Sequence, residues 1–492
     1  MDKKTLKKTF TYKPIEEKYQ GKKLLFFGIG SGVTVAFVLG LLLEIIGTPL
    51  FNAKTYANQL PIETSSTEEF NENFNFDGDV KLPILDKDLA FKVAQSKLST
   101  YGSQYTIDSD NFTILSVTRN GEDQLIRVAP LEYTGLFVAL SRKEEGTIGY
   151  IEVNVVTKET KLVEVNGGLK YMPSGLLDKD LDRHIRFNYP SALFSEKYFE
   201  IDDEGKPYWV IPTYVNQICL FNGGMPNGTI IVDPVNGDIN RYSIGEEPSW
   251  VDRVVLETLV ESQATNALEY KNGFFNAVFG SKKDVFQTSD GYNYFIKNGH
   301  TYYVSCITSP NENDQTSIGF LTIDLKTREA KQYNIPGITE MRAREIAMQH
   351  EDVKAQQLEA TWPILIDYKG IPTYFLVLKN DVQDRKIVLL DVETGAKIAL
   401  GSTLNETKVN YDKLINASGN TSDTVLEGDF VVDRVQVYGS DLYFTVEGIE
   451  DKYFVVASSV SIDAMFLKSG DSIHLTYVAY ESYNYVKTLT RS

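Results

Sequence analysis

The residues that could hold a metal are few and scattered. The chain of 492 residues contains four histidines, His184, His300, His350 and His474, each in a different segment. A zinc site needs ligands at short spacing, and the sequence has no H-E-x-x-H, no H-x-H and no second histidine within one helical turn. We therefore expect no metal and no other cofactor.

Nucleophilic catalysis has no better support. The sequence has no G-x-S-x-G, no S-x-x-K with its partner motifs, and none of the common glycine-rich loops that bind nucleotide phosphates. The two cysteines, Cys219 and Cys306, lie in apolar strand-like runs. Two separate buried thiols are the favoured interpretation, and one disulfide between them stays an alternative. We expect a protein that is not an enzyme.

Two local clusters of charge could bind ions. In residues 177–190, Arg183, His184 and Arg186 could form an anion site, since arginine and histidine donate to carboxylate and phosphate groups. The favoured alternative is a charged surface helix with one half-buried histidine. Residues 200–209 gather four acidic residues before a glycine, but the distal glutamate of a calcium loop is missing. A solvated acidic hairpin is expected there.

The elements that position these residues begin with a basic tail and an apolar run. Residues 1–23 hold eight lysines against three acidic residues. Residues 24–46 carry one charge, Glu44, and as a helix they would span roughly 34 Å, enough for a hydrocarbon layer of about 30 Å. This pattern predicts an uncleaved transmembrane helix over 24–46 at the cell membrane, with a cytoplasmic tail and an extracytoplasmic body. Gly28 and Gly32 form a GxxxG pair that could give a membrane-dimer face, and so a homodimer.

The rest of the chain is strongly acidic, since the whole protein carries a formal net charge of −18 despite its basic tail. Affinity for nucleic acid depends on Lys and Arg neutralising phosphates, so we expect no nucleic-acid partner. Residues 47–82 are polar, acidic and rich in asparagine, without a sustained period. They are expected to form a stalk.

One pattern recurs four times in the body, in which an apolar run meets a short polar turn and a second run. The copies span residues 149–165, 228–244, 319–335 and 385–400. Equivalent places in the four copies are held by Asn154, Asp233, Asp324 and Asp391. Such a side chain accepts hydrogen bonds from the backbone two residues on. Each copy therefore predicts two antiparallel strands.

Helical segments precede the hairpins and define the expected domains. The helical candidates are residues 85–102, 177–190, 249–270 and 339–360, and the units are 83–170, 171–247, 248–337 and 338–401. Residues 402–424 form a linker with a short helix, and residues 425–492 alternate in five runs that predict a small β-barrel-like module, similar to an OB-fold. The expected fold class is α+β, with one N-terminal transmembrane helix, tandem helix-plus-antiparallel-sheet units and a C-terminal all-β module.

The fourth unit carries a family resemblance. Its turn VLLDVETGAKI is similar to the V-x-x-D-x-x-T-G-x turn of PepSY-type domains. The match is good over residues 339–400, moderate over 173–244 and loose in the other two units. The whole chain also resembles membrane-anchored envelope proteins of Gram-positive bacteria that combine an N-terminal anchor with such repeats. The resemblance implies an envelope role and brings no catalytic residues to this sequence.

Together these features predict a single-pass, membrane-anchored extracytoplasmic envelope protein without enzymatic activity. It is expected to bind or regulate another exported protein, for example a peptidase, or a cell-wall component. Two alternatives stay open. One is a cell-surface hydrolase that uses a carboxylate pair. The other is an assembly or signalling component of an envelope complex.

Overall fold

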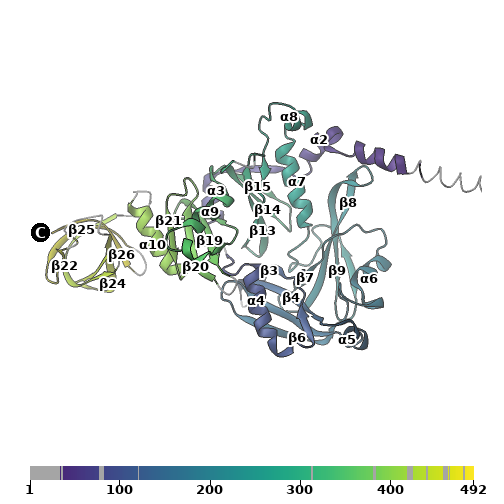
Figure 1. Ribbon diagram of the computed structural model, residues 1–492, viewed down its shortest axis with the longest axis horizontal. Helices are drawn as coiled ribbons and strands as arrows, with labels where there is room; N and C mark the ends of the chain where they lie inside the picture. The colour runs from purple at the N-terminus through teal and green to yellow at the C-terminus, as the bar shows by residue number, and fades with distance from the viewer. Residues whose placement is uncertain are drawn as a thin grey trace, which may run out of the picture.

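The structure is a computed structural model, and it describes residue 34 and residues 37–491, apart from 77–81, 120, 312–313, 381–383, 418–424, 439–440, 458–463, 465 and 480–482. Within these residues the strands form four sheets and a closed barrel, with helices between them. The barrel lies at one end of an elongated molecule, and an apolar helix leaves the other end (Figure 1).

Two sheets pack together in the first part of the body. The first has the order β2-β4-β5-β6, with β3 paired to β4, and the second has the order β10-β9-β8-β7. The strands of the first sheet are β2 (Tyr105–Ile107), β3 (Thr113–Arg119), β4 (Glu122–Tyr133), β5 (Thr147–Asn154) and β6 (Thr160–Leu169). Those of the second are β7 (Tyr198–Ile201), β8 (Pro207–Ile218), β9 (Asn222–Val232) and β10 (Ile239–Tyr242). Alternation along β5 sends Tyr150 into the core shared with Trp209 of the second sheet, and Ile151 into the core beneath helix α4 (Lys87–Leu98).

A third and a fourth sheet share the largest core. The third sheet contains β1 (Ile62–Ser65), β11 (Gln287–Thr288), β12 (Asn293–Lys297), β13 (His300–Thr308), β14 (Thr316–Asp324), β15 (Ala330–Tyr333) and β16 (Gly337–Ile338). The fourth contains β17 (Glu359–Ala360), β18 (Ile364–Tyr368), β19 (Ile371–Lys379), β20 (Asp384–Asp391) and β21 (Ile398–Gly401). Phe320 of the third sheet and Phe375 of the fourth lie in one buried cluster. Helix α7 (Glu257–Glu269) packs on the other face of the third sheet, and α9 (Glu340–Gln349) packs on the fourth.

The last five strands close into a barrel in the order β22-β23-β24-β26-β25. They are β22 (Val425–Tyr438), β23 (Asp441–Val446), β24 (Ile449–Ala457), β25 (Ser472–Ala479) and β26 (Tyr483–Arg491). Helix α10 (Leu404–Ala417) connects the barrel to the fourth sheet (Figure 1). Its Asp412 accepts hydrogen bonds from Tyr368 of the sheet at 3.0 Å and from Tyr483 of the barrel at 2.8 Å, so one buried carboxylate joins the two modules.

The four predicted hairpins are present as the antiparallel pairs β5–β6, β9–β10, β14–β15 and β20–β21. In each turn the predicted side chain bonds to the backbone just after it. Asn154 accepts from Val156 N at 3.0 Å, and Asp324 accepts from Lys326 N at 2.8 Å. Asp233 makes the equivalent bond with Val235 N, whereas Asp391 accepts from Thr394 N, three residues on. These short-range bonds explain why the hairpins could be read from the sequence.

The predicted fold class is wrong. The structure is mixed α/β, with several sheets that share cores and one five-stranded barrel, instead of independent tandem units behind a membrane helix. No single helix in the described part of the chain is long and apolar enough to cross a membrane. The helix Phe37–Ile46 and α2 (Pro49–Ala57) meet that test only together, and they meet at a bend of 48°. The helix breaks there because Pro49 cannot continue its hydrogen-bond ladder. Residues 24–33, with Gly28 and Gly32, lie outside the described residues.

Residues 47–82 were expected to form a stalk, and their described part instead packs on the body. Strand β1 pairs in parallel with β15. Helix α3 (Thr67–Asn73) and the residue after it bury Phe70 and Phe74, whose rings stack 4.9 Å apart and lie against Tyr333. The polar composition of this segment did not indicate that it packs on the body. Two aromatic residues spaced by four are enough to fix a short helix to a core.

We expect the Phe70→Ala substitution to lower the free energy of unfolding by about 3 to 5 kcal/mol, since it removes a fully buried ring and leaves a cavity. Urea denaturation measures the change. Phe137→Ala is the matched control, because the Phe137 side chain is 85% exposed. Equal unfolding midpoints for the two variants would show that residues 47–76 do not belong to the folded body.

Candidate functional site

A cavity of about 550 Å³ is lined by residues of the first, second and third sheets and of the start of α7. Four parts of the chain supply the side chains that matter most for its chemistry. They are Phe112 and Arg127 from the first sheet and its edge, Glu196 and Tyr198 at β7, Arg253 and Glu257 at α7, and Tyr292 and Tyr294 at β12. The cavity is therefore formed by segments that are far apart in the sequence.

Arg253 is the buried cation of the cavity wall, with 2% of its surface exposed. Its backbone N–H donates to the carboxylate of Glu200 at 3.1 Å. Its guanidinium donates to Glu257 at 3.2 Å and lies 4.5 Å from the centre of the Tyr294 ring. Arg253 thus has a carboxylate counter-ion and an aromatic support that hold the group in one position.

Arg127, on β4, is a second cation in the same wall, and it differs from Arg253 in having no ion pair among the described residues. Its guanidinium donates to the carbonyl oxygen of Phe112 at 3.1 Å, and its Nε is buried without a hydrogen-bond partner. No carboxylate among the described residues forms an ion pair with it. Burial lowers the pKa of Arg127 to about 10, and the nearby charge of Arg253 acts in the same direction. At neutral pH both groups carry a positive charge toward the cavity.

The two glutamates of the wall are already engaged. Glu196 accepts the backbone N–H groups of Glu257 at 2.9 Å and of Thr258 at 3.2 Å, so it caps the first turn of α7. Glu257 bonds Arg253 and accepts the hydroxyl of Tyr292. These two glutamates are therefore already bonded, whereas Arg127 has no ion pair among the described residues.

Behind the cavity a pair of buried carboxylates joins the three sheets. Glu200 on β7 accepts the backbone N–H of Asp252 at 2.9 Å, in addition to that of Arg253. Asp252 accepts the N–H of Ser116 on β3 at 2.6 Å and the hydroxyl of Thr301 on β13 at 3.1 Å. Burial raises the pKa of both carboxyl groups. The predicted acidic hairpin at 200–209 is thus only partly solvated, since Glu200 faces inward.

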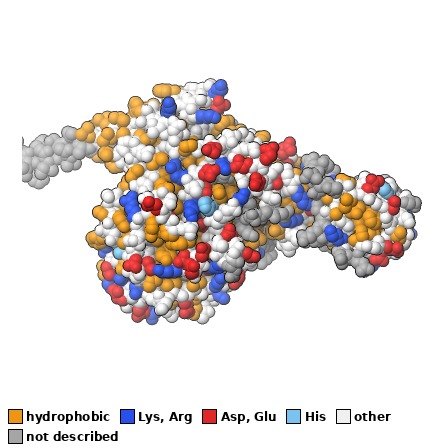
Figure 2. Space-filling model, turned by 180° about the vertical axis from the view of Figure 1, so that it is seen from behind, with side chains coloured by type: hydrophobic (Ala, Val, Ile, Leu, Met, Phe, Trp, Pro, Cys, Tyr) orange, Lys and Arg blue, Asp and Glu red, His pale blue; other side chains and the backbone are white. Residues whose placement is uncertain are grey.

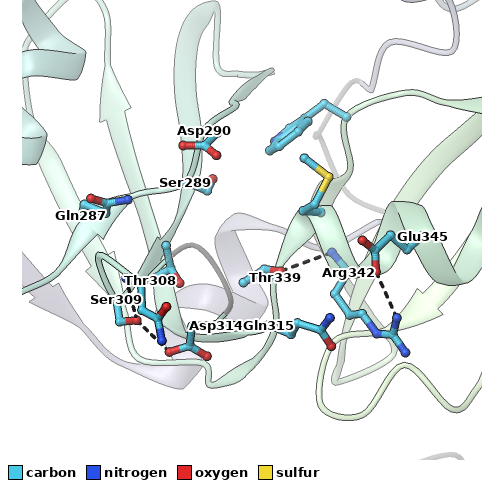
Figure 3. Close-up of a pocket in the computed structure, with 13 residues that line it drawn as sticks. Gln287, Ser289, Asp290, Thr308, Ser309, Asp314, Gln315, Thr339, Arg342 and Glu345 are labelled. Carbon is cyan, nitrogen blue, oxygen red and sulfur yellow. Dashed lines mark hydrogen bonds and ion pairs between the residues drawn. The ribbon is translucent and has the colours of Figure 1, made fainter.

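A second, smaller groove of about 300 Å³ lies between the third sheet and α9 (Figure 3). Arg342 and Glu345 point into it and pair with each other at 3.0 Å, both more than a third exposed. Trp362 also lines the groove, but its ring packs on Gly291. The guanidinium of Arg344 lies 5.2 Å from the centre of the same ring. Because its arginine is exposed and already paired, this groove is the weaker candidate.

The structure does not bring Arg183, His184 and Arg186 together around a shared space. On α6 (Leu181–Asn188), His184 Nε2 lies 2.8 Å from the carbonyl oxygen of Gly237. The guanidinium of Arg186 donates to the carbonyl of Ala192 and lies 4.2 Å from the Phe194 ring centre. These contacts hold α6 against neighbouring segments, while Arg183 faces solvent.

The alternative of a disulfide between Cys219 and Cys306 is wrong, because both thiols are free. Cys219 lies in the tight turn between β8 and β9, and Cys306 is buried on β13 with its Sγ 3.1 Å from the Tyr374 hydroxyl. Burial raises the pKa of the Cys306 thiol, which keeps it protonated. Among the described residues no three His, Cys, Asp or Glu side chains are grouped so that they could hold a metal ion.

Sequence reasoning missed Arg127 and Arg253. The segment PSWVDRV was expected to begin a helix, but residues 251–254 are a buried irregular segment and α7 begins at Glu257. One signal was available. Asp252 and Arg253 stand between valines, and charged residues inside an apolar run are buried only when they are paired.

The Glu200→Gln substitution tests the buried carboxylate pair. A carboxyl group whose pKa is raised by folding holds its proton more tightly in the folded state, so its contribution to stability falls as the pH rises above the ordinary glutamate pKa of about 4.3. Glutamine cannot ionise and presents an amide donor to one of the two N–H groups, so the variant is less stable at pH 5. We expect the difference in the free energy of unfolding between wild type and variant to narrow by about 1.4 kcal/mol or more between pH 5 and pH 8. This change corresponds to a shift of at least one unit in the pKa of Glu200 on folding. Denaturant unfolding at both pH values measures the difference, and a difference that widens with pH would contradict the assignment.

No family model and no curated protein matches the sequence. Among solved structures, the HINa domain of Ifi202 in complex with double-stranded DNA is 12% identical, and the match covers 27% of this chain and 90% of that chain with a TM-score of 0.12. The levansucrase of Bacillus subtilis is 10% identical over 86% of this chain and 94% of that chain, with a TM-score of 0.20. A mutant levansucrase of B. megaterium is 11% identical over 88% and 96%, also with a TM-score of 0.20. Scores this low show no shared fold and carry no argument about function.

Proposed function

We propose that this chain is a non-enzymatic protein of the cell envelope, with its body outside the cytoplasm, and that it binds an anionic group of an exported protein or wall component in the cavity walled by Arg127 and Arg253. The observation that carries the proposal is that Arg127 lines an open space of about 550 Å³ without an ion pair among the described residues. A half-buried cation without an ion pair is costly, and an anion that enters the cavity lowers that cost.

The walls define what the ligand looks like. Arginine binds carboxylate and phosphate groups through charge-assisted hydrogen bonds, which are stronger than neutral ones. The rings of Phe112, Tyr198, Tyr292 and Tyr294 line part of the wall and suit an apolar or ring-shaped portion of the ligand. The volume falls within the range of roughly 300 to 1,000 Å³ that is typical of small-molecule sites. A side chain or a short segment of a larger partner would fit the same space.

The envelope location is proposed from the sequence. Eight lysines precede the apolar run, and few follow it directly. Excess Lys on one side of an apolar segment marks the cytoplasmic side. The acidic body then belongs on the outer side of the membrane, where exported proteins and wall components are available as partners.

The geometry does not favour a hydrolase with a carboxylate pair. Glu196 and Glu257, which line the cavity, are held by the start of α7, by Arg253 and by Tyr292. A general acid or a nucleophile needs a carboxyl group free to contact the substrate. Glu257 instead holds the Arg253 guanidinium, and Glu196 caps the start of α7.

Thermal or urea unfolding of the full-length protein in detergent tests the site, with inorganic phosphate as the probe against chloride at equal ionic strength. We expect phosphate to stabilise the wild-type protein, by about 2.7 kcal/mol at one hundred times its dissociation constant. We expect Arg127→Met to abolish this response. Without phosphate the variant is expected to be more stable than wild type by about 1 kcal/mol, because a half-buried charge without an ion pair is removed.

Arg183→Met is the matched control, since Arg183 is an exposed arginine on α6 that does not line the cavity. It is expected to respond to phosphate as wild type does. A wild-type protein without any phosphate response, or an Arg127→Met variant that responds fully, would overturn the proposed site.

A further inference from the structure

Exposed large apolar side chains gather at the end of the body from which the helix Phe37–Ile46 departs. We call this surface the apolar rim. Its main members are Phe51, Leu220, Phe221, Phe275 and Phe279, each between 62% and 75% exposed. Single exposed apolar residues are ordinary on a folded protein, whereas a contiguous group marks a surface that something covers.

Three segments far apart in the sequence form the rim. Helix α2 carries Phe51 and contacts both α7 and α8 (Phe274–Val278). The turn between β8 and β9 carries Leu220 and Phe221, and its Asn222 side chain lies against Gly47 at the base of the apolar helix. Figure 1 places α2, α8 and the outer end of β8 together at this end of the molecule.

The rim is held in shape by local bonds. Asn216 donates to the carbonyl of Leu220 at 2.8 Å, and Cys219 and Gly223 adopt positive φ angles that tighten the β8–β9 turn. At α8 the rings of Phe275 and Phe279 lie 6.4 Å apart. Ordered elements thus hold the aromatic side chains of the rim in defined positions, as a binding surface requires.

Lysines surround these apolar side chains. The exposed lysines of the same elements are Lys54 on α2, Lys271 before α8, and Lys282 and Lys283 after it. Glu44 is the sole acidic residue within 37–58, and residues 270–283 contain none. In a protein with a net charge of −18, this concentration of positive charge complements an anionic surface. Figure 2 shows hydrophobic and basic side chains side by side at this end of the molecule.

We propose that the rim docks the body against the surface of a bilayer that contains anionic lipid. The rim is continuous with the helix Phe37–Ile46, whose large apolar side chains at seven positions are each at least 47% exposed. Successive residues of a helix point about 100° apart, so these side chains face all directions. A protein groove would cover one stripe of such a helix, whereas lipid covers every side. Aromatic rings flanked by lysines are the pattern of side chains at a membrane interface.

This inference goes beyond the proposed function, since the rim and the cavity share no residue. Docking would fix the height and tilt of the body above the lipid. It would therefore limit which exported partners can reach the cavity. The contact adds to any attachment made by the N-terminal segment and depends on the lipid headgroups.

A fluorescent probe tests the contact. In the full-length chain with Cys219→Ser, Phe279→Cys is labelled with the environment-sensitive dye NBD, and the buried Cys306 stays unlabelled. The protein is reconstituted into vesicles of phosphatidylcholine with phosphatidylglycerol. We expect the dye to be quenched by spin-labelled lipid and shielded from aqueous iodide. Phe137→Cys on α5 (Leu136–Ser141) is the matched control, since it is 85% exposed and remains open to iodide.

Charge reversal then tests the role of the lysines. We expect Lys282→Glu with Lys283→Glu, or vesicles of phosphatidylcholine alone, to weaken the lipid contact at position 279 by roughly fivefold per lysine lost. Arg127→Met is expected to leave the contact unchanged, so that failure of the cavity proposal and failure of this one are told apart. A dye at position 279 as open to iodide as the dye at 137 would overturn the inference. So would shielding that grows with protein concentration without lipid quenching, because a second copy would then cover the rim.

Discussion

The architecture of the body depends on the hydrogen bonds that two buried carboxylates make with the backbone. Glu200 accepts the N–H groups of Asp252 and Arg253, and Asp252 accepts from Ser116 and Thr301. These bonds connect β7, β3 and β13, which belong to three different sheets. A carboxylate buried without such partners would cost several kcal/mol, so the sheets can meet here only in the arrangement that satisfies both groups. The same bonds place Arg253 in the wall of the central cavity.

The two arginines of the cavity wall differ in their bonding partners, and this difference indicates which of them has a structural role and which can bind a ligand. Arg253 has a carboxylate, a carbonyl and an aromatic ring as partners, so its charge is accounted for within the fold. Arg127 lies in the same wall with one carbonyl partner and the Phe112 ring at 5.8 Å, but with no ion pair among the described residues. Folding alone does not require a second cation in this position. An anionic ligand supplies the missing partner and gives the cavity its proposed role, while the lysine-flanked rim gives the body an orientation toward lipid.

The features that could be predicted from the sequence are those fixed by neighbouring residues. The hairpin turns at Asn154 and Asp324 follow from bonds to the backbone two residues on, and the cap of α9 at Thr339 follows from the same kind of contact. The predicted fold class was wrong because packing between residues far apart in the sequence decides the fold. Phe70 joins a polar segment to a distant core, and Phe320 and Phe375 place two sheets around that same core. The candidate anion site at Arg183, His184 and Arg186 was the less favoured interpretation, and the fold brings the Ala192 carbonyl to the Arg186 side chain. No spacing rule connects Arg127 with Arg253, which are 126 positions apart.

The central claim is that the cavity beside Arg127 holds an anion. A crystal structure of the protein soaked in selenate, with data collected at the selenium absorption edge, tests it most directly. The account predicts an anomalous peak within hydrogen-bonding distance of the Arg127 guanidinium, inside the space walled by Tyr198 and Tyr294. A cavity filled by water alone, with selenate bound only to surface lysines, would contradict it.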